Sequence, residues 1–390
     1  MTYPETEIRD AFRLQAEWCD KLGSPFTALL CRTLADRLDE TSAFGHRALS
    51  WPLKTLRADL LALRCCGALH YHVRAKPHSK LAKAYPPNPT PDADRLWNAI
   101  RATVAERDKA LTRFLDTPPQ TNEVSRAGVL LGGLLRVAAR WNLPLSLIEI
   151  GASAGLNLNF DRFFYDLGEG RTWGDPQSAV CVKSEWHGDI PPLDAPLQIA
   201  AQLGNDQKPL NPARTDDRRR LLAYIWPDQF DRLQRLEAAL EIAAKHPVEI
   251  AEEDAAKFLA SCLARKSHDG VARVVFHTIV LQYASKETRA AIKETLRRGG
   301  RACHAGRAAG ALLDGAREAR CAGDRPPLAL AGRRGAHRWG VRLARHLGRV
   351  AAGGLTNPET LIGFSRVSPK LARPTLPTSL RWDMPFRNIA

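Results

Sequence analysis

The sequence predicts an α/β protein in which a mostly parallel sheet follows an all-helical N-terminal domain. Residues 1–142 carry runs with apolar residues three or four apart, which is typical of amphipathic helices. From residue 143 onward, short apolar runs alternate with helical patterns, as a doubly wound sheet requires. The 390 residues are 44% hydrophobic and 25% charged, which is enough for a substantial core and two domains.

The N-terminal segment is expected to form a helical cap domain over residues 1–142. Such a domain typically covers a substrate site or makes a dimer surface. The run Pro86-Pro87-Asn88-Pro89 interrupts the helical pattern and marks a loop. The expected helices cover residues 5–22, 25–38, 53–73, 92–115 and 124–141.

The most informative segment is the strand 145–150 followed by Gly151-Ala152-Ser153-Ala154-Gly155 and a helical pattern over 156–165. Gly151 and Gly155 permit positive φ and a close approach of the backbone. The N-terminus of the expected helix would offer unpaired N–H groups to a ligand. The segment therefore predicts a ligand-binding turn in a domain covering residues 143–300, although a tight turn without a ligand has the same pattern.

Glu149 decides which ligand is expected, because it lies two residues before the first glycine. A carboxylate there would repel a pyrophosphate, whereas S-adenosylmethionine carries an ammonium and a sulfonium. The pattern acid-x-Gly-x-x-x-Gly after an apolar strand resembles motif I of the Rossmann-like, class I methyltransferases. The resemblance implies a Rossmann-like sheet, S-adenosylmethionine as cofactor, and contacts from Glu149, Gly151, Ser153 and Gly155.

A serine hydrolase is an alternative, because the same turn satisfies the nucleophile-elbow pattern G-x-S-x-G. Ser153 would be the nucleophile, and Asp206 and His277 follow it in the acid-then-histidine order of that class. Such an elbow lies in the middle of a sheet, so several strands should precede it. Residues 1–145 show almost none.

Three further strands are expected downstream, at 196–203, 248–250 and 271–280, with a short strand or hairpin inserted over 178–186. Asp206 ends the first of these strands, where a ribose hydroxyl pair would be bound. Asp254 follows the second strand and is a candidate adenine-side contact. An acid in the first turn of a helix can also simply complement the helix dipole.

The strand 271–280 supplies the candidate catalytic residues. Ligands of open α/β sheets bind outside the carboxyl ends of the strands, so His277, Gln282 and Tyr283 could reach the reacting centre. His277 would act as a general base, since its ordinary pKa lies near neutrality. It could equally be a hydrogen-bonded histidine within the sheet.

Four segments of the chain carry a further resemblance. They are Trp18–Pro25, Ile148–Leu158, Asp217–Ala243 with Tyr224-Ile225-Trp226-Pro227-Asp228-Gln229, and Val274–Tyr283. Together they resemble an uncharacterised bacterial family, domain of unknown function 2332, over about residues 11–296, and the resemblance implies no established activity. Asn157 belongs to one of these segments and could line the same pocket, although an Asn in the first turn of a helix can also satisfy local backbone.

The composition changes abruptly at residue 301. Residues 301–350 contain eleven Arg, no Lys and three acidic residues. Residues 301–390 as a whole contain 16 basic and 5 acidic residues, and so carry most of the chain's formal net charge of +15. Such a basic tail could bind nucleic acid by counterion release. However, Trp339 is the only aromatic residue among the arginines of residues 301–350. We expect the tail to be poorly ordered and to form no regular element after residue 361.

A sequence rich in Arg, Ala, Gly and Pro and without Lys also results when GC-rich DNA is translated in a shifted reading frame. One codon choice for Leu330-Ala331-Gly332-Arg333-Arg334, shifted by one nucleotide, reads Trp-Pro-Gly-Gly. Our hypothesis is that the frame is lost near residues 297–300 and that the last strands of the sheet are missing. Resequencing the gene tests it.

The sequence thus predicts an S-adenosylmethionine-dependent methyltransferase acting on an unidentified small molecule or macromolecule. A non-catalytic nucleotide-binding or scaffold protein is the alternative, and the hydrolase is the third. No apolar leader and no run of 18 apolar residues occurs, so we expect a cytoplasmic protein without membrane contact. The eight cysteines form no C-x-x-C pair, so no metal site is expected.

Overall fold

The computed structural model describes residues 3–186, 188–265, 270–305, 310–311 and 360–364. The chain forms two compact units. A helical unit comprises Met1–Thr121 and Asn211–Glu241, and a sheet unit comprises Asn122–Leu210 and Ile242–Ala390. This division differs from the expected boundary at residue 142, because the segment 122–142 belongs with the sheet and a later segment joins the helices.

The helical unit closely follows the apolar periodicity of its sequence. One short helix over 43–49 was not expected, and the helix expected from residue 53 begins at Leu61. The elements of the unit are α1 (Tyr3–Lys21), α2 (Pro25–Arg37), α3 (Ala43–Leu49), α4 (Leu61–Ala75), η1 (Ala82–Ala84), α5 (Ala93–Phe114), α7 (Thr215–Ala223) and the first part of α8 (Phe230–Lys245).

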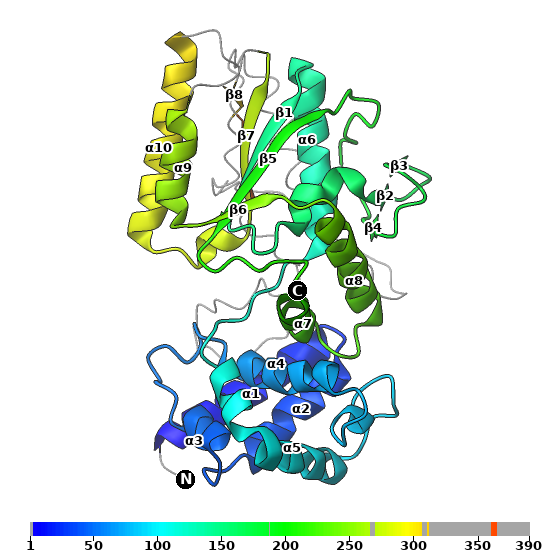
Figure 1. Cartoon of the computed structure of the whole chain (residues 1–390), viewed down its shortest axis with the longest axis vertical. Helices are drawn as coiled ribbons and strands as arrows, with labels where there is room; N and C mark the ends of the chain where they lie inside the picture. Colours follow the sequence, from blue (N-terminus) through cyan, green and yellow to red (C-terminus); the bar gives the residue numbers. More distant parts are fainter. Residues whose placement is uncertain (1–2, 187, 266–269, 306–309, 312–359, 365–390) are drawn as a thin grey trace, which may run out of the picture. The chain divides into compact units, whose positions relative to one another are not determined.

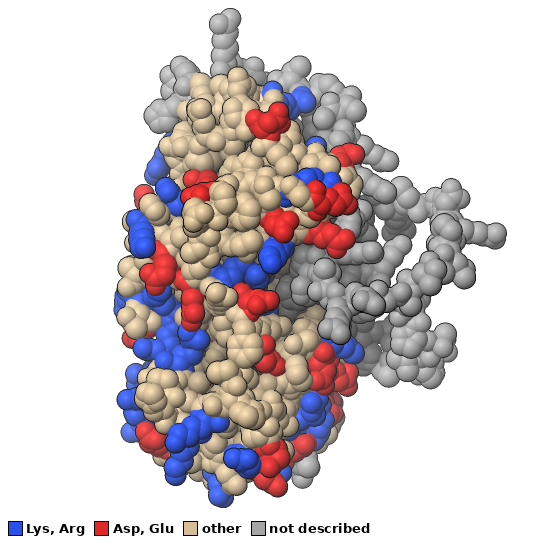
Figure 2. All heavy atoms as spheres, turned by 90° about the vertical axis from the view of Figure 1, so that its right-hand side faces the viewer, with Lys and Arg blue, Asp and Glu red and all other residues tan. Residues whose placement is uncertain are grey.

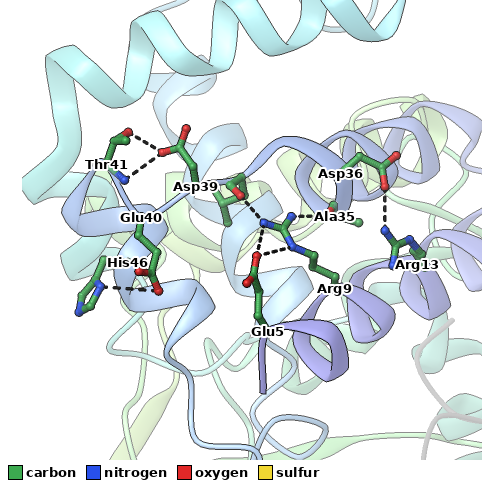
Figure 3. Close-up of polar contacts among 10 residues, drawn as sticks. Glu5, Arg9, Arg13, Ala35, Asp36, Asp39, Glu40, Thr41 and His46 are labelled. Carbon is green, nitrogen blue, oxygen red and sulfur yellow. Dashed lines mark hydrogen bonds and ion pairs between the residues drawn. The ribbon is translucent and has the colours of Figure 1, made fainter. Parts of the chain in front are cut away.

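Polar side chains fix the ends of α2 within this unit. Arg9 of α1 is buried, and it donates hydrogen bonds to the Glu5 carboxylate (2.8 Å) and to the carbonyl of Leu38 (2.7 Å) beyond the end of α2 (Figure 3). At the other end, the Asp228 carboxylate accepts from the Ser24 hydroxyl and from the N–H of Phe26 (2.8 Å). These contacts satisfy groups that a helix leaves unpaired at its ends.

The segment 211–241 belongs to the helical core. Ala223, Tyr224 and Trp226 are buried in one apolar cluster with residues of α1, α2, α4 and α5. Gly67 of α4 lies so close to Tyr224 that a Cβ at Gly67 would meet the tyrosine ring at 2.6 Å. The segment that follows the second strand of the sheet therefore supplies part of the core of the other unit.

The sheet unit contains parallel strands in the order β6-β5-β1-β7, so the fold is a mixed helical and α/β fold. Helices α9 (Ala255–Ala264) and α10 (Lys286–Ala305) lie on one side of the sheet, and α6 (Ala127–Trp141), which follows η2 (Val124–Arg126), lies on the other (Figure 1). The strands are β1 (Leu145–Ile150), β5 (Ile199–Asp206), β6 (Glu249–Glu252) and β7 (Ala272–Thr278).

The register explains which residues share a face. Glu149 pairs with Gly204 of β5 and Phe276 of β7, and Ile150 pairs with Asn205 and His277. Paired residues point to the same face, and successive residues alternate. Because Ile150 packs in a cluster with residues of α9 and α10, Glu149 belongs to the opposite face.

The chain between β1 and β5 differs from the expected helix over 156–165. It forms a 3₁₀ helix, η3 (Leu156–Arg162), and a small sheet in the order β3-β2-β4. β4 (Cys181–Lys183) confirms the expected inserted strand, and its partners are β2 (Phe164–Asp166) and β3 (Thr172–Trp173). Asn159, inside η3, has non-helical backbone angles.

Most of the basic tail lies outside the described residues. Two of its short segments, β8 (Gly310–Ala311) and β9 (Thr360–Phe364), pair in parallel with β7. β9 overlaps the region where no regular element was expected, so that expectation is corrected. In the part of the chain that the structure describes, no helix is long and apolar enough to cross a membrane.

Candidate functional site

The candidate site lies at the carboxyl ends of β1, β5 and β7 in the sheet unit. β1 lies between the other two strands, so Ile150, Asn205 and His277 form one row across the sheet. The chain leaves β1 through the turn 151–155. In open parallel sheets this edge is where ligands bind.

The turn requires its two glycines. Gly151 has φ +70°, and a Cβ there would meet Cγ2 of Val280 at 2.3 Å. Gly155 also has φ +70°, and a Cβ would meet Cδ1 of Ile250 at 3.0 Å. The expectation that these positions need glycine for positive φ and close approach is confirmed.

Two residues without the freedom of glycine also have positive φ at this edge. Ser153, in the middle of the turn, has φ +56°, and Ile279, directly after β7, has φ +70°. Positive φ is unusual for a β-branched side chain and costs conformational energy, and such residues cluster at functional sites. The strained Ile279 precedes Val280, which contacts the turn at Gly151.

Four of the five backbone N–H groups of the turn 151–155, and that of Leu156, have acceptors within the chain. The turn therefore offers few free N–H groups to an anion, and a 3₁₀ helix stands where the ligand-facing α-helix was expected. The hydrogen bonds are Gly151 N to Asn205 Oδ1 (3.4 Å), Ala152 N to Asn205 O (2.8 Å), Ser153 N to Asp206 Oδ2 (3.0 Å), Gly155 N to Ala152 O (2.8 Å) and Leu156 N to Asn122 Oδ1 (3.1 Å).

Glu149 is fully buried, and among the described residues neither of its carboxylate oxygens has a hydrogen-bond partner. Burial raises the pKa of the Glu149 carboxyl well above its usual range; the charge of Arg126 opposes this shift and that of Asp206 adds to it. An unpaired carboxylate in the interior is costly, so burial favours the protonated form of this group. A buried titratable group with a strongly shifted pKa at a strand end is a candidate ligand contact.

Two other side chains of the same segment are buried without partners. The amide of Asn157 in η3 is fully buried, and within the described part of the chain its nitrogen and oxygen make no hydrogen bond. The Ser153 hydroxyl, 7% exposed, is likewise unpaired there. Buried polar atoms are normally hydrogen-bonded, so each of these needs an explanation.

Asp206 lies where expected, at the end of β5 beside the turn. Its carboxylate accepts from the N–H of Ser153 (3.0 Å) and of Lys208 (2.9 Å). Because a carboxylate has about four acceptor positions, further donors can still be bound. Asp254, in contrast, caps α9 by accepting from the N–H groups of Ala256 (3.0 Å) and Lys257 (3.2 Å).

The structure does not bring the candidate catalytic residues together with Glu149. His277 is 4% exposed and shares its face of the sheet with Ile150, opposite Glu149. Tyr283 follows η4 (Val280–Gln282) and is 62% exposed, and Gln282 ends that turn. These candidate catalytic side chains therefore do not converge with Glu149 on a single point.

Two asparagines that the sequence analysis did not single out hold the turn. Asn205 accepts from Gly151 and donates to the carbonyl of Glu253 (2.9 Å), and Asn122 binds Leu156. The sequence could have pointed to Asn205, because it follows Gly204 at the end of an expected strand. Asn122 had none, since it lies far from the turn along the chain.

The hydrolase alternative gains no support from this geometry. The Ser153 hydroxyl has no hydrogen-bond partner among the described residues, so it is not paired with His277. β1 is the first strand of the described chain, whereas a nucleophile elbow follows several strands.

The family comparison covers most of the chain. The model of a protein family described as "Uncharacterized protein conserved in bacteria (DUF2332)" matches residues 9–353. The match runs well past residue 296, where the resemblance was expected to stop, and includes the Arg-rich segment. No curated protein and no solved structure matches the chain. The chain belongs to this uncharacterised bacterial family.

Proposed function

We propose that the sheet unit binds S-adenosylmethionine at the carboxyl ends of β1, β5 and β7 and that the protein transfers its methyl group to an unidentified acceptor. The observation that carries the proposal is the buried carboxyl of Glu149, which has no hydrogen-bond partner among the described residues. The strand order β6-β5-β1-β7 supports it, because the strands added after β1 lie first on one side of it (β5, β6) and then on the other (β7), so the strand order reverses at β1 while all four strands stay parallel. In Rossmann-like sheets the strands run 3-2-1-4 in this way, and ligands bind at the reversal.

The residues fit a cationic ligand better than a phosphate. Most of the turn amides are occupied, and two acids, Glu149 and Asp206, lie at this edge. Glu149 would lose its proton and pair with the ammonium of the ligand. Asp206 would accept from ribose hydroxyls with its remaining lone pairs, and Asn157 would hydrogen-bond the ligand through its unpaired amide.

The bound cofactor supplies a methyl group on a positively charged sulfur. The chain contributes mainly alignment of the acceptor, which can account for a large part of a rate enhancement. Where the acceptor needs a base, such a group contributes about 10²–10⁴-fold. His277 is the candidate, at the end of β7 on the face of the sheet opposite Glu149, so the acceptor would have to reach it from that side. The exposed Tyr283 would contact the acceptor.

Titration calorimetry of the full chain with S-adenosylhomocysteine tests the proposal. We expect binding to the native protein and at least about tenfold weaker binding to Glu149→Gln, since a charge-assisted hydrogen bond is lost. Glu249→Gln is the matched control, because Glu249 is exposed at the amino end of β6 in the same sheet. Methylthioadenosine, which lacks the amino group, should bind weakly and equally to all three proteins.

Other outcomes would overturn the proposal. Equal binding of S-adenosylhomocysteine to native protein and Glu149→Gln would remove the role of the carboxylate. Binding of NAD in place of S-adenosylhomocysteine would favour the nucleotide-binding alternative. Covalent labelling of Ser153 by a fluorophosphonate would favour the hydrolase.

A further inference from the structure

The helical unit contains a cavity of about 340 Å³ that is lined by α4, α5, Lys76 after α4, and Arg220 of α7. Its volume falls within the range of small-molecule sites. All of its lining residues belong to the helical unit, whereas the candidate site belongs to the sheet unit. We call it the basic cavity.

The lining of the basic cavity is strongly cationic. Lys76, Arg107, Arg113 and Arg220 line it, and no carboxylate does. Arg107 pairs with Glu106 (3.0 Å), but among the described residues Lys76 and Arg113 form no ion pair. On the molecular face shown in Figure 2, basic and acidic side chains are interspersed.

The charges nearest to this lining do not neutralise it. The hydroxyl of Tyr71, a lining residue, donates to Asp216 (3.3 Å), but Asp216 also pairs with Arg219 (2.8 Å). Burial lowers the pKa of His72, the remaining titratable residue of the lining, so its imidazole is neutral at pH 7 and provides a hydrogen-bonding nitrogen. The excess positive charge therefore comes from lysine and arginine.

An aromatic wall accompanies these charges. The rings of Tyr71 and Phe114 lie 5.3 Å apart, and the Arg220 guanidinium lies 4.3 Å from the centre of the Phe114 ring. Stacking on an aromatic ring holds a guanidinium in place while leaving most of its N–H donors available. The small residues Ala68 and Ala110 leave space beside the rings.

Helix α5 is broken at one of the cationic residues. Arg107 has φ −126° and ψ 19° inside the helix, and α5 contains neither proline nor glycine. The next residue, Asp108, accepts from the N–H groups of Ala43 (2.8 Å) and Phe44 (2.7 Å) at the start of α3. The break therefore has a local cause in the contacts of Asp108, and it lies directly at a residue that lines the basic cavity.

We propose that the basic cavity binds a small organic anion. A flat apolar body would lie against Tyr71, Leu111 and Phe114, and a carboxylate or phosphate would be held by Arg107, Arg113 and Arg220. Guanidinium groups bind both kinds of anion with paired N–H donors. The positive lining selects against neutral and cationic molecules of the same shape.

Titration calorimetry of the full chain tests this proposal. The ligands are 1-naphthyl phosphate and 1-naphthoate, so that a phosphate and a carboxylate on the same ring system are compared. We expect at least one of them to bind about tenfold more tightly than neutral 1-naphthol and than inorganic phosphate, and its affinity to fall with added salt. Arg113→Gln should weaken that binding about tenfold. Arg101→Gln is the matched control, because Arg101 is an exposed residue of the same helix outside the cavity.

Arg113 is exposed, so its substitution should leave the fold intact, and circular dichroism of both variants checks this. The proposal is overturned if neither anion binds at millimolar concentration or if 1-naphthol binds as tightly as the anions. Equal binding by Arg113→Gln and Arg101→Gln would also overturn it. Binding of inorganic phosphate as tightly as 1-naphthyl phosphate would show that no apolar body is recognised, which contradicts the proposal as well.

Discussion

The Asp206 carboxylate accepts a hydrogen bond from the backbone N–H of Ser153 across 3.0 Å. This bond joins the end of β5 to the turn after β1 and places a negative group where a phosphate would have to bind. Together with the buried carboxyl of Glu149, it makes this edge of the sheet suitable for a cation. The same relationship explains why Ser153 keeps a positive φ, since its N–H is held by the neighbouring strand.

Glu149→Gln should stabilise the protein at neutral pH. The folded-state pKa of Glu149 is raised above its unfolded value, so the folded state loses stability as pH rises from about 4.3 toward the folded pKa. Glutamine removes this loss. Urea denaturation should therefore show similar stability of variant and native protein at pH 4 and greater stability of the variant at pH 7.5. A less stable variant at pH 7.5 would mean that Glu149 is ionised and paired.

Binding of S-adenosylhomocysteine should release up to one proton, because protonated Glu149 must ionise to pair with the ligand ammonium. Affinity should rise with pH below the folded pKa of Glu149. Calorimetry in two buffers of different ionisation enthalpy, such as phosphate and Tris, measures the proton release directly. An enthalpy independent of the buffer would contradict this mechanism.

Gly151→Ala should destabilise the sheet unit strongly. The substitution adds a Cβ at φ +70° that would meet Val280 at 2.3 Å. Gly168→Ala is the control, because Gly168 has φ +83° with nothing within 4 Å of its Cβ position. We expect Gly151→Ala to cost about 1–3 kcal/mol more in the free energy of unfolding than the control, owing to the clash. Equal costs would show that Val280 moves away freely.

Asp228→Ala should destabilise the helical unit by about 1–2 kcal/mol, because the start of α2 loses a capping carboxylate. Asp228 accepts from Ser24 and from the N–H of Phe26. Asp231→Ala, at an exposed position in the first turn of α8, is the control. Thermal unfolding of both variants measures the difference, and an unchanged melting temperature for Asp228→Ala would exclude the capping role.

The helical unit should lose stability in acid through His70. Burial lowers the pKa of His70 to about 3, below the unfolded value of 6.5, so the unfolded chain binds a proton that the folded one does not. Stability is therefore lost as pH falls from about 6.5 toward about 3. In His70→Gln the dependence of the unfolding free energy on pH should be weaker by up to one proton. His78→Gln, at an exposed position, is the control, and identical slopes for native protein and His70→Gln would contradict the assignment.

Local sequence predicted the elements whose formation depends on near neighbours. The apolar spacing of the first 142 residues gave most of the helices, and the run Leu145–Ile150 gave β1. The need for glycine at 151 and 155 was also readable, since a tight turn after a strand restricts φ. The extent of the 3₁₀ helix after the turn was not, because Leu156 binds the distant Asn122.

The sequence by itself determined that a helical region precedes parallel strands, that a glycine turn follows the first strand, and that an acid stands before that turn. Only the tertiary structure decided that residues 211–241 complete the helical core, that most of the turn amides are occupied, and that Glu149 and His277 face opposite sides of the sheet. The physical reason is that the spacing of apolar residues indicates which side chains are buried, but not which residues they contact. Strand register and contacts between distant segments decide where each polar group meets its partner.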